Sequence, residues 1–155
     1  MQIPEPLVQH LWLQKLVGEW NVESEFSFGP DQPPSKMTGR EVVRSFGELW
    51  TIGEGTGACD SIMTLGYDPQ KGRFVGTFIA SVMTHLWLYD GQLDSTGKIL
   101  TLNSEGPSFS GDGSMAKFQD IIEFISDDHR TLTAKFLDGD GAWHQFMTTH
   151  YRRIS

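Results

Sequence analysis

The chain has 155 residues, with 12 Lys or Arg against 20 Asp or Glu, a formal net charge of −8. This excess of acid argues against binding to nucleic acid or to an anionic membrane, because both need clustered basic side chains. The length and a hydrophobic fraction of 38% predict a single globular domain spanning residues 1–155. The first residues lack the basic start and apolar run of a signal peptide, and the lone Cys59 allows no internal disulfide. We therefore expect a cytoplasmic protein.

One segment near the N-terminus predicts a helix. Across residues 7–16, apolar side chains recur at spacings of three and four residues, which places them on one stripe. Pro6 suits the first turn, where its missing N–H costs nothing. Gly18 is expected to end the helix, as glycine often does just past a helix terminus.

Beyond Gly18 the hydrophobic period changes from 3.6 to 2. In residues 20–28 the even positions are mostly apolar and the odd ones polar, which is typical of a strand with one face in a core. Turns rich in glycine, aspartate and proline then separate nine further predicted strands. These strands are 36–46, 49–56, 60–67, 72–80, 82–89, 97–104, 114–125, 130–137 and 142–152.

Short connections between successive strands predict that neighbours in sequence are neighbours in space. A long antiparallel sheet twists and tends to close, which removes its exposed edges. The expected fold is therefore all-β, a single antiparallel up-and-down barrel of about 8–10 strands with a short N-terminal helix.

The first and last predicted strands carry residues that suit the closure of such a barrel. Gly18 and Trp20 begin the first strand, and Arg152 and Arg153 end the last one. Because these strands are neighbours in a closed meander, one of the two arginines is expected to stack on the indole of Trp20 and seal that end. We assign this role to Arg152.

A short helix, a Gly-x-Trp triplet and a basic residue on the final strand resemble the calycins, which include lipocalins, fatty-acid-binding proteins and nitrobindins. Finer features resemble an uncharacterised bacterial family known only as a domain of unknown function. The resemblance implies a compact calycin-like barrel without an established reaction. The residues that carry it are Leu16-Val17-Gly18-Glu19-Trp20, Leu65-Gly66-Tyr67-Asp68, Lys71, Phe74, Tyr89-Asp90-Gly91, Leu93-Asp94, Gly97, Met147 and Tyr151-Arg152.

The inward side chains of a barrel this size either fill the lumen or leave a pocket for one ligand. Our leading hypothesis is a binding protein for a small hydrophobic or amphipathic molecule. Arg44 is a candidate anchor for a ligand carboxylate. If Arg40 and Arg44 instead face outward, their neighbours Val42 and Phe46 mark a candidate dimer surface. The candidates for lining the lumen are Trp20, Phe26, His85, Trp87, Trp143 and Tyr151.

The role of His85 depends on which face of strand 82–89 points inward. If the face with Trp87 and Tyr89 does so, His85 is a buried titratable group that can orient a ligand or act as a general base. If Leu86 and Leu88 face inward, His85 is solvated. An enzyme that uses His85 is therefore the first alternative to a binding protein.

The remaining histidines bear on cofactors. His144 and His150 share a face of the last strand, but six residues separate them by about 20 Å, too far to bind one metal ion. We expect no metal site and no cofactor. Haem is the one cofactor we considered, because nitrobindins hold it through a C-terminal histidine, a role open to His144 or His150. The last alternative is a barrel filled by side chains that acts through its surface as a homodimer.

Overall fold

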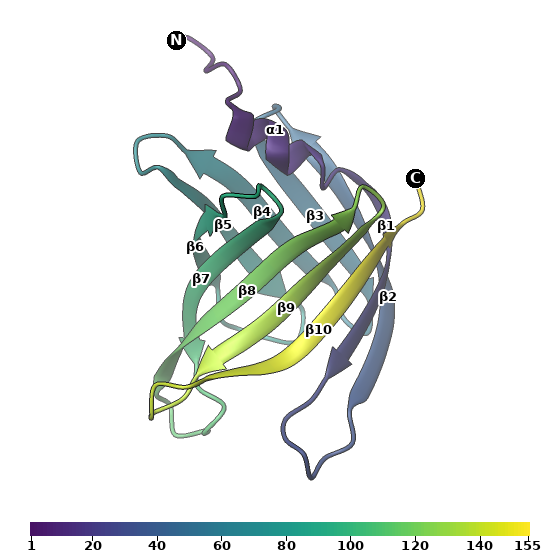
Figure 1. Cartoon of the computed structure of the whole chain (residues 1–155), viewed down its shortest axis with the longest axis vertical. Coiled ribbons are helices and arrows are strands. Elements are labelled where there is room, and N and C mark those ends of the chain that lie inside the picture. The colour runs from purple at the N-terminus through teal and green to yellow at the C-terminus, as the bar shows by residue number, and fades with distance from the viewer.

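The computed structural model describes residues 1–155 and shows one short helix and ten strands. Each strand pairs antiparallel with the next, and β1 also pairs with β10, so the sheet closes into an up-and-down barrel (Figure 1). The predicted fold class is confirmed. The elements are α1 (Val8–Gln14), β1 (Gly18–Phe26), β2 (Ser35–Phe46), β3 (Trp50–Gly57), β4 (Ser61–Asp68), β5 (Arg73–Ala80), β6 (Trp87–Leu93), β7 (Ile99–Pro107), β8 (Met115–Ser126), β9 (His129–Leu137) and β10 (Trp143–Arg153).

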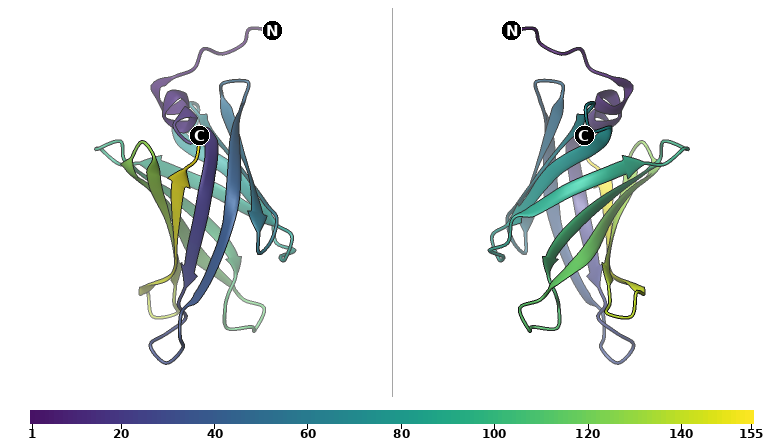
Figure 2. Two further views of the ribbon diagram at one scale, coloured as in Figure 1. Left: turned by 90° about the vertical axis from the view of Figure 1, so that its right-hand side faces the viewer. Right: turned by 90° about the vertical axis from the view of Figure 1, so that its left-hand side faces the viewer.

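The two ends of the barrel differ (Figure 2). At one end, here called the helix end, α1 lies across the strands. The Trp12 indole donates a hydrogen bond of 2.7 Å to the Gly97 carbonyl, and the Lys15 ammonium lies 5.1 Å from the Phe124 ring centroid. The other end, here called the loop end, carries the connections 27–34, 108–114 and 138–142. None of the helical structure is long and apolar enough to span a bilayer.

Two predicted boundaries are wrong because a glycine was interpreted as a stop signal. Gly91 lies inside β6, where a Cβ would come within 2.6 Å of the Thr101 carbonyl oxygen, so this glycine permits close strand packing and makes no turn. The helix ends at Gln14, and Gly18 begins β1 with a φ of +140°. A Cβ on Gly18 would come within 2.4 Å of the Arg153 guanidinium.

An aromatic and cationic stack closes the seam between β1 and β10. The fully buried Trp20 indole contacts two guanidinium carbons, that of Arg153 at 4.2 Å and that of Arg130 at 4.6 Å from the ring centroid. Arg130 also lies 3.8 Å from the ring centroid of Tyr151. Attraction between each cation and the ring faces ties three strands together at the helix end.

The assignment of Arg152 to this stack is wrong by one residue. Side chains alternate along β10, so Tyr151 and Arg153 point inward while Arg152 points outward. The Arg152 side chain is 54% exposed and faces Glu23 at 3.6 Å. Arg153 additionally donates hydrogen bonds to the carbonyls of Val17 and Lys15.

The interior is packed solid near the helix end and becomes more accessible toward the loop end. Leu13, Trp20, Leu100 and Leu102 have no exposed surface. Further along, inward side chains keep partial exposure although strands surround them on all sides. Such residues are Val22, Ser24, Met63, Phe78, Trp87, Asp120 and Met147. The loop-end half of the lumen is therefore not completely filled.

The stack at the seam predicts unequal effects for two adjacent arginines. Arg153→Ala removes a cation–π contact and hydrogen bonds from a cation, so the free energy of unfolding should fall by about 2 kcal/mol. Arg152→Ala removes only an exposed ion pair and should change it by less than about 0.5 kcal/mol. Urea denaturation followed by far-UV circular dichroism measures both values. Equal losses in the two variants would contradict the role given to Arg153.

Candidate functional site

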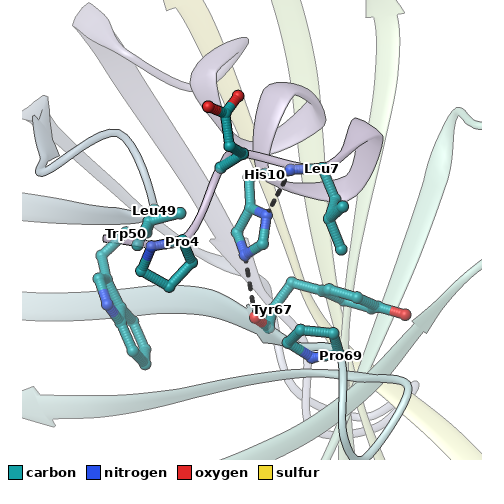
Figure 3. Close-up of a pocket in the computed structure, with 8 residues that line it drawn as sticks. Pro4, Leu7, His10, Leu49, Trp50, Tyr67 and Pro69 are labelled. Carbon is teal, nitrogen blue, oxygen red and sulfur yellow. Dashed lines mark hydrogen bonds between the residues drawn. The ribbon is translucent and has the colours of Figure 1, made fainter. Parts of the chain in front are cut away.

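A cavity of about 320 Å³ lies outside the barrel at the helix end, between the N-terminal segment and β3–β4 (Figure 3). His10 forms its inner wall. Its Nδ1 accepts a hydrogen bond of 2.9 Å from the Leu7 N–H, which leaves the proton on Nε2 for the 3.0 Å bond to the Tyr67 carbonyl. Both ring nitrogens are thus occupied in holding α1 to β4, and we interpret His10 as a structural anchor.

A larger cavity, of about 730 Å³, lies where β6 and β7 separate. The ladder between these strands ends at the pair Asp90–Asn103, yet β6 extends back to Trp87 and β7 extends on to Pro107. We call the resulting gap the side opening. The residues that line the cavity are His85, Leu86, Leu88, Asp90, Asn103, Ser104, Glu105, Met115, Lys117, Phe118 and Trp143.

Residues of the outer surface and of the inward strand faces together line the side opening. Leu86 and Leu88 lie on its outer rim and are 52% and 62% exposed, whereas Ser104 and Phe118 belong to the inward faces of β7 and β8. An apolar rim next to inward-facing groups suits the passage of an apolar molecule.

Trp87 and His85 narrow the opening from within. The Trp87 ring lies directly over Gly106, where a Cβ would come within 2.2 Å of it, and its centroid is 5.0 Å from that of Phe118. His85 packs edge-on against Trp87, and its Nε2 donates a 2.9 Å hydrogen bond to the Glu105 carbonyl. The Nε1 of Trp87 is buried without a partner. A buried donor of this kind costs free energy until an acceptor reaches it.

Tyr89 and Asp120 form the next layer inward on the same two strands, β6 and β8. The Tyr89 hydroxyl donates a hydrogen bond of 2.5 Å to Asp120 Oδ2. Burial raises the pKa of Asp120 to about 6, although the bond from Tyr89 opposes that shift. Burial and the neighbouring Asp120 charge also raise the pKa of Tyr89.

The other ionisable groups around Asp120 leave its charge without a cation. Arg130 is bound to Glu41 at 2.8 Å, with both side chains largely buried, so these two charges offset each other. Tyr151 stacks on Arg130, and burial raises its pKa, which keeps it neutral. At neutral pH the lumen therefore holds one unpaired carboxylate.

Aromatic rings cover the loop end. Phe109, from the connection 108–114, packs edge-to-face with centroid distances of 5.6 Å to Phe28, 5.6 Å to Phe118, 5.3 Å to Phe136 and 5.0 Å to Phe146. These rings pack against one another across the loop end of the lumen.

Five of the residues predicted to line the lumen face inward or lie at the side opening. Phe26 and Trp87 face the loop-end half of the lumen, and His85 lies at the side opening. Trp20 and Tyr151 also face inward, but both belong to the seam stack.

Two candidates for the lumen lie outside it. A β-bulge between Gln145 and Met147 reverses the alternation along β10, so Trp143 faces the outer part of the side opening. Arg44 lies on the outer face of β2, 3.9 Å from Glu54 and 55% exposed, so it cannot anchor a ligand inside. Arg40 shares this outer face.

Neither histidine considered for haem is enclosed by apolar side chains of the lumen. His150 lies on the outer face of β10, where its Nδ1 is 2.9 Å from His129 Nε2. His144 is 49% exposed at the loop end, with its Nε2 held by Asp138. The polar interior pair Tyr89–Asp120 is not among the residues that the sequence predicts for the lumen. The alternation of Asp120 with Phe118, Ile122 and Phe124 along β8 is the signal that points to it.

The unpaired carboxylate predicts a pH-dependent stability difference. Because the folded-state pKa of Asp120 is raised from 3.8 to about 6, the folded protein binds the proton more tightly, and its stability falls as pH rises between those values. Asp120→Asn should therefore raise the free energy of unfolding by about 2–3 kcal/mol at pH 7.5 and by only about 0.5 kcal/mol at pH 4. Urea titrations at both pH values measure this. Glu123→Gln, on the outer face of β8, is the control, and a loss of stability in Asp120→Asn at both pH values would refute the prediction.

Comparison with one solved structure supports the barrel fold. The crystal structure of Rv2717c from M. tuberculosis matches with a TM-score of 0.67 and 12% identity, covering 97% of this chain and 100% of that one. A redesigned β-barrel, mFAP1, bound to DFHBI, matches with a TM-score of 0.42 and 18% identity, covering 91% of this chain and 97% of the design. No curated protein matches. The model of a family described as protein of unknown function (DUF1579) matches residues 5–153, so the chain belongs to that family.

Proposed function

We propose that the protein binds a small hydrophobic or amphipathic molecule in the loop-end half of its lumen. The observation that carries this proposal is the partial exposure of inward side chains around Trp87, whose indole N–H is buried without a partner, and Asp120, whose carboxylate has no cation beside it. A barrel built only for stability gains by filling such space with apolar side chains and by omitting an unpaired acid.

The chemistry of this space suits an amphipathic ligand. Val22, Met63, Phe78 and Met147 supply apolar contacts along the wall. A ligand acceptor would satisfy the buried Trp87 N–H, whose burial without a partner is otherwise costly. Lumen sites usually combine an apolar wall with a few polar groups in this way.

The side opening provides the route of entry in this proposal. Movement of the Trp87 and His85 side chains would admit a ligand without breaking a β-ladder, because β6 and β7 are unpaired there.

A carrier of this kind would resemble lipocalins and fatty-acid-binding proteins in function as well as in its barrel, and we propose the calycin relationship on that basis. We propose the cytoplasm as its location because Cys59 is the only cysteine and is free.

Two adjacent residues of β4 test the lumen as the binding site. Met63 points into the accessible half of the lumen, and Ile62 points outward with 40% exposure. With the uncharged fluorescent probe N-phenyl-1-naphthylamine, wild type and Ile62→Trp should show saturable fluorescence enhancement. Met63→Trp fills the lumen and should weaken binding at least tenfold.

Urea denaturation should first show that both variants fold cooperatively. Absence of binding to wild type, or equal affinity in the two variants, would contradict the proposal. Native mass spectrometry of the purified protein, compared with its denatured mass, can then identify a ligand carried from the cell.

A further inference from the structure

Resting on that proposed function, we propose that the ligand is a cationic amphiphile, an apolar chain or ring bearing a protonated amine that binds the carboxylate of Asp120. Tyr89 positions this carboxylate by occupying Oδ2. No side chain donates to Oδ1, which leaves that oxygen for the ligand.

The interior charges favour a cation over an anion. Of the arginines whose side chains face inward, Arg130 is bound to Glu41 and Arg153 lies in the seam. No inward cation is left for a ligand carboxylate. An anionic ligand would add a second negative charge beside Asp120 in a medium of low polarity, where such repulsion is strong. A protonated amine would instead form a charge-assisted hydrogen bond with Asp120.

The surrounding side chains also suit an amine. Trp87 and Phe118 lie one layer toward the loop end, on the same strands as Tyr89 and Asp120. Their ring faces attract a cation, and their area covers the apolar chain attached to it. Ser104 and Phe118 line the side opening, which places the carboxylate next to the route of entry.

The unpaired carboxylate also lowers the stability of the folded protein. A buried acid without a cation is destabilising at neutral pH. Groups held at such a cost are more frequent in binding and catalytic sites than elsewhere. A ligand cation would remove this cost, which explains why the lumen keeps an acid without a cationic partner here.

The experiment compares three probes with the same ten-carbon chain, namely decylamine, decanol and decanoate. Each competes against N-phenyl-1-naphthylamine at pH 7.5, below its micelle concentration. We expect decylamine to bind at least tenfold more tightly than decanoate, with decanol between them. Asp120→Asn should weaken decylamine at least tenfold and leave decanol within twofold.

Two controls separate a specific site from general attraction to an acidic protein. Glu123→Gln removes one outward acid from the same strand and should leave all three affinities unchanged. In wild type, decylamine should bind more weakly at pH 5 than at pH 7.5, because Asp120 gains a proton while the amine keeps its own. That dependence should disappear in Asp120→Asn.

The outcomes distinguish the two proposals. If no probe binds, the proposed function itself fails. If decanol binds and decylamine gains no advantage, or decanoate binds most tightly, only the assignment of a cationic ligand fails. A decylamine preference that survives in Asp120→Asn would also overturn the role of Asp120.

Discussion

The contact between Trp20 and the guanidinium groups of Arg153 and Arg130 is the interaction on which the barrel depends. It joins β1 to β10, and without that closure two edge strands would be exposed. Arg153 further binds carbonyls in the segment between α1 and β1, so the same side chain holds the helix over the barrel end. Closure of the sheet and coverage of its end thus share one group of residues.

That arrangement divides the interior into two halves with different properties. The stack and α1 supply enough large side chains to fill the helix end completely. Toward the loop end the inward residues keep partial exposure, and the separation of β6 from β7 opens the wall. The Tyr89–Asp120 layer lies where the two halves meet. A ligand there would contact the tightly packed helix-end core on one side and the aromatic rings of the loop end on the other.

The sequence predicts the architecture well because alternation is a local signal. Alternation of apolar and polar residues predicts the strand from Trp20 to Phe26 and the number of strands. The short turns between those strands then predict that the first strand pairs with the last. The sequence predicts the site less well because alternation fails at irregularities. The bulge in β10 turns Trp143 outward, and Gly91 resembles a turn residue but serves strand packing. Asp120 and Tyr89 meet across β7, from two strands that are not paired with each other. The charge balance of the lumen likewise depends on the pairing of Glu41 with Arg130, which lie far apart in the chain.

The seam has a consequence for how the protein is made. The bond from Arg153 to the Val17 carbonyl joins residues 136 positions apart, so the barrel cannot close until β10 has left the ribosome. Until then β1 and the latest strand each present an open edge to other chains. A topology whose final contact is its most distant one folds slowly. The outer face of β1 carries the acidic side chains Glu19, Glu23 and Glu25. Their charge would help to prevent the unpaired edge of β1 from pairing with a strand of another chain.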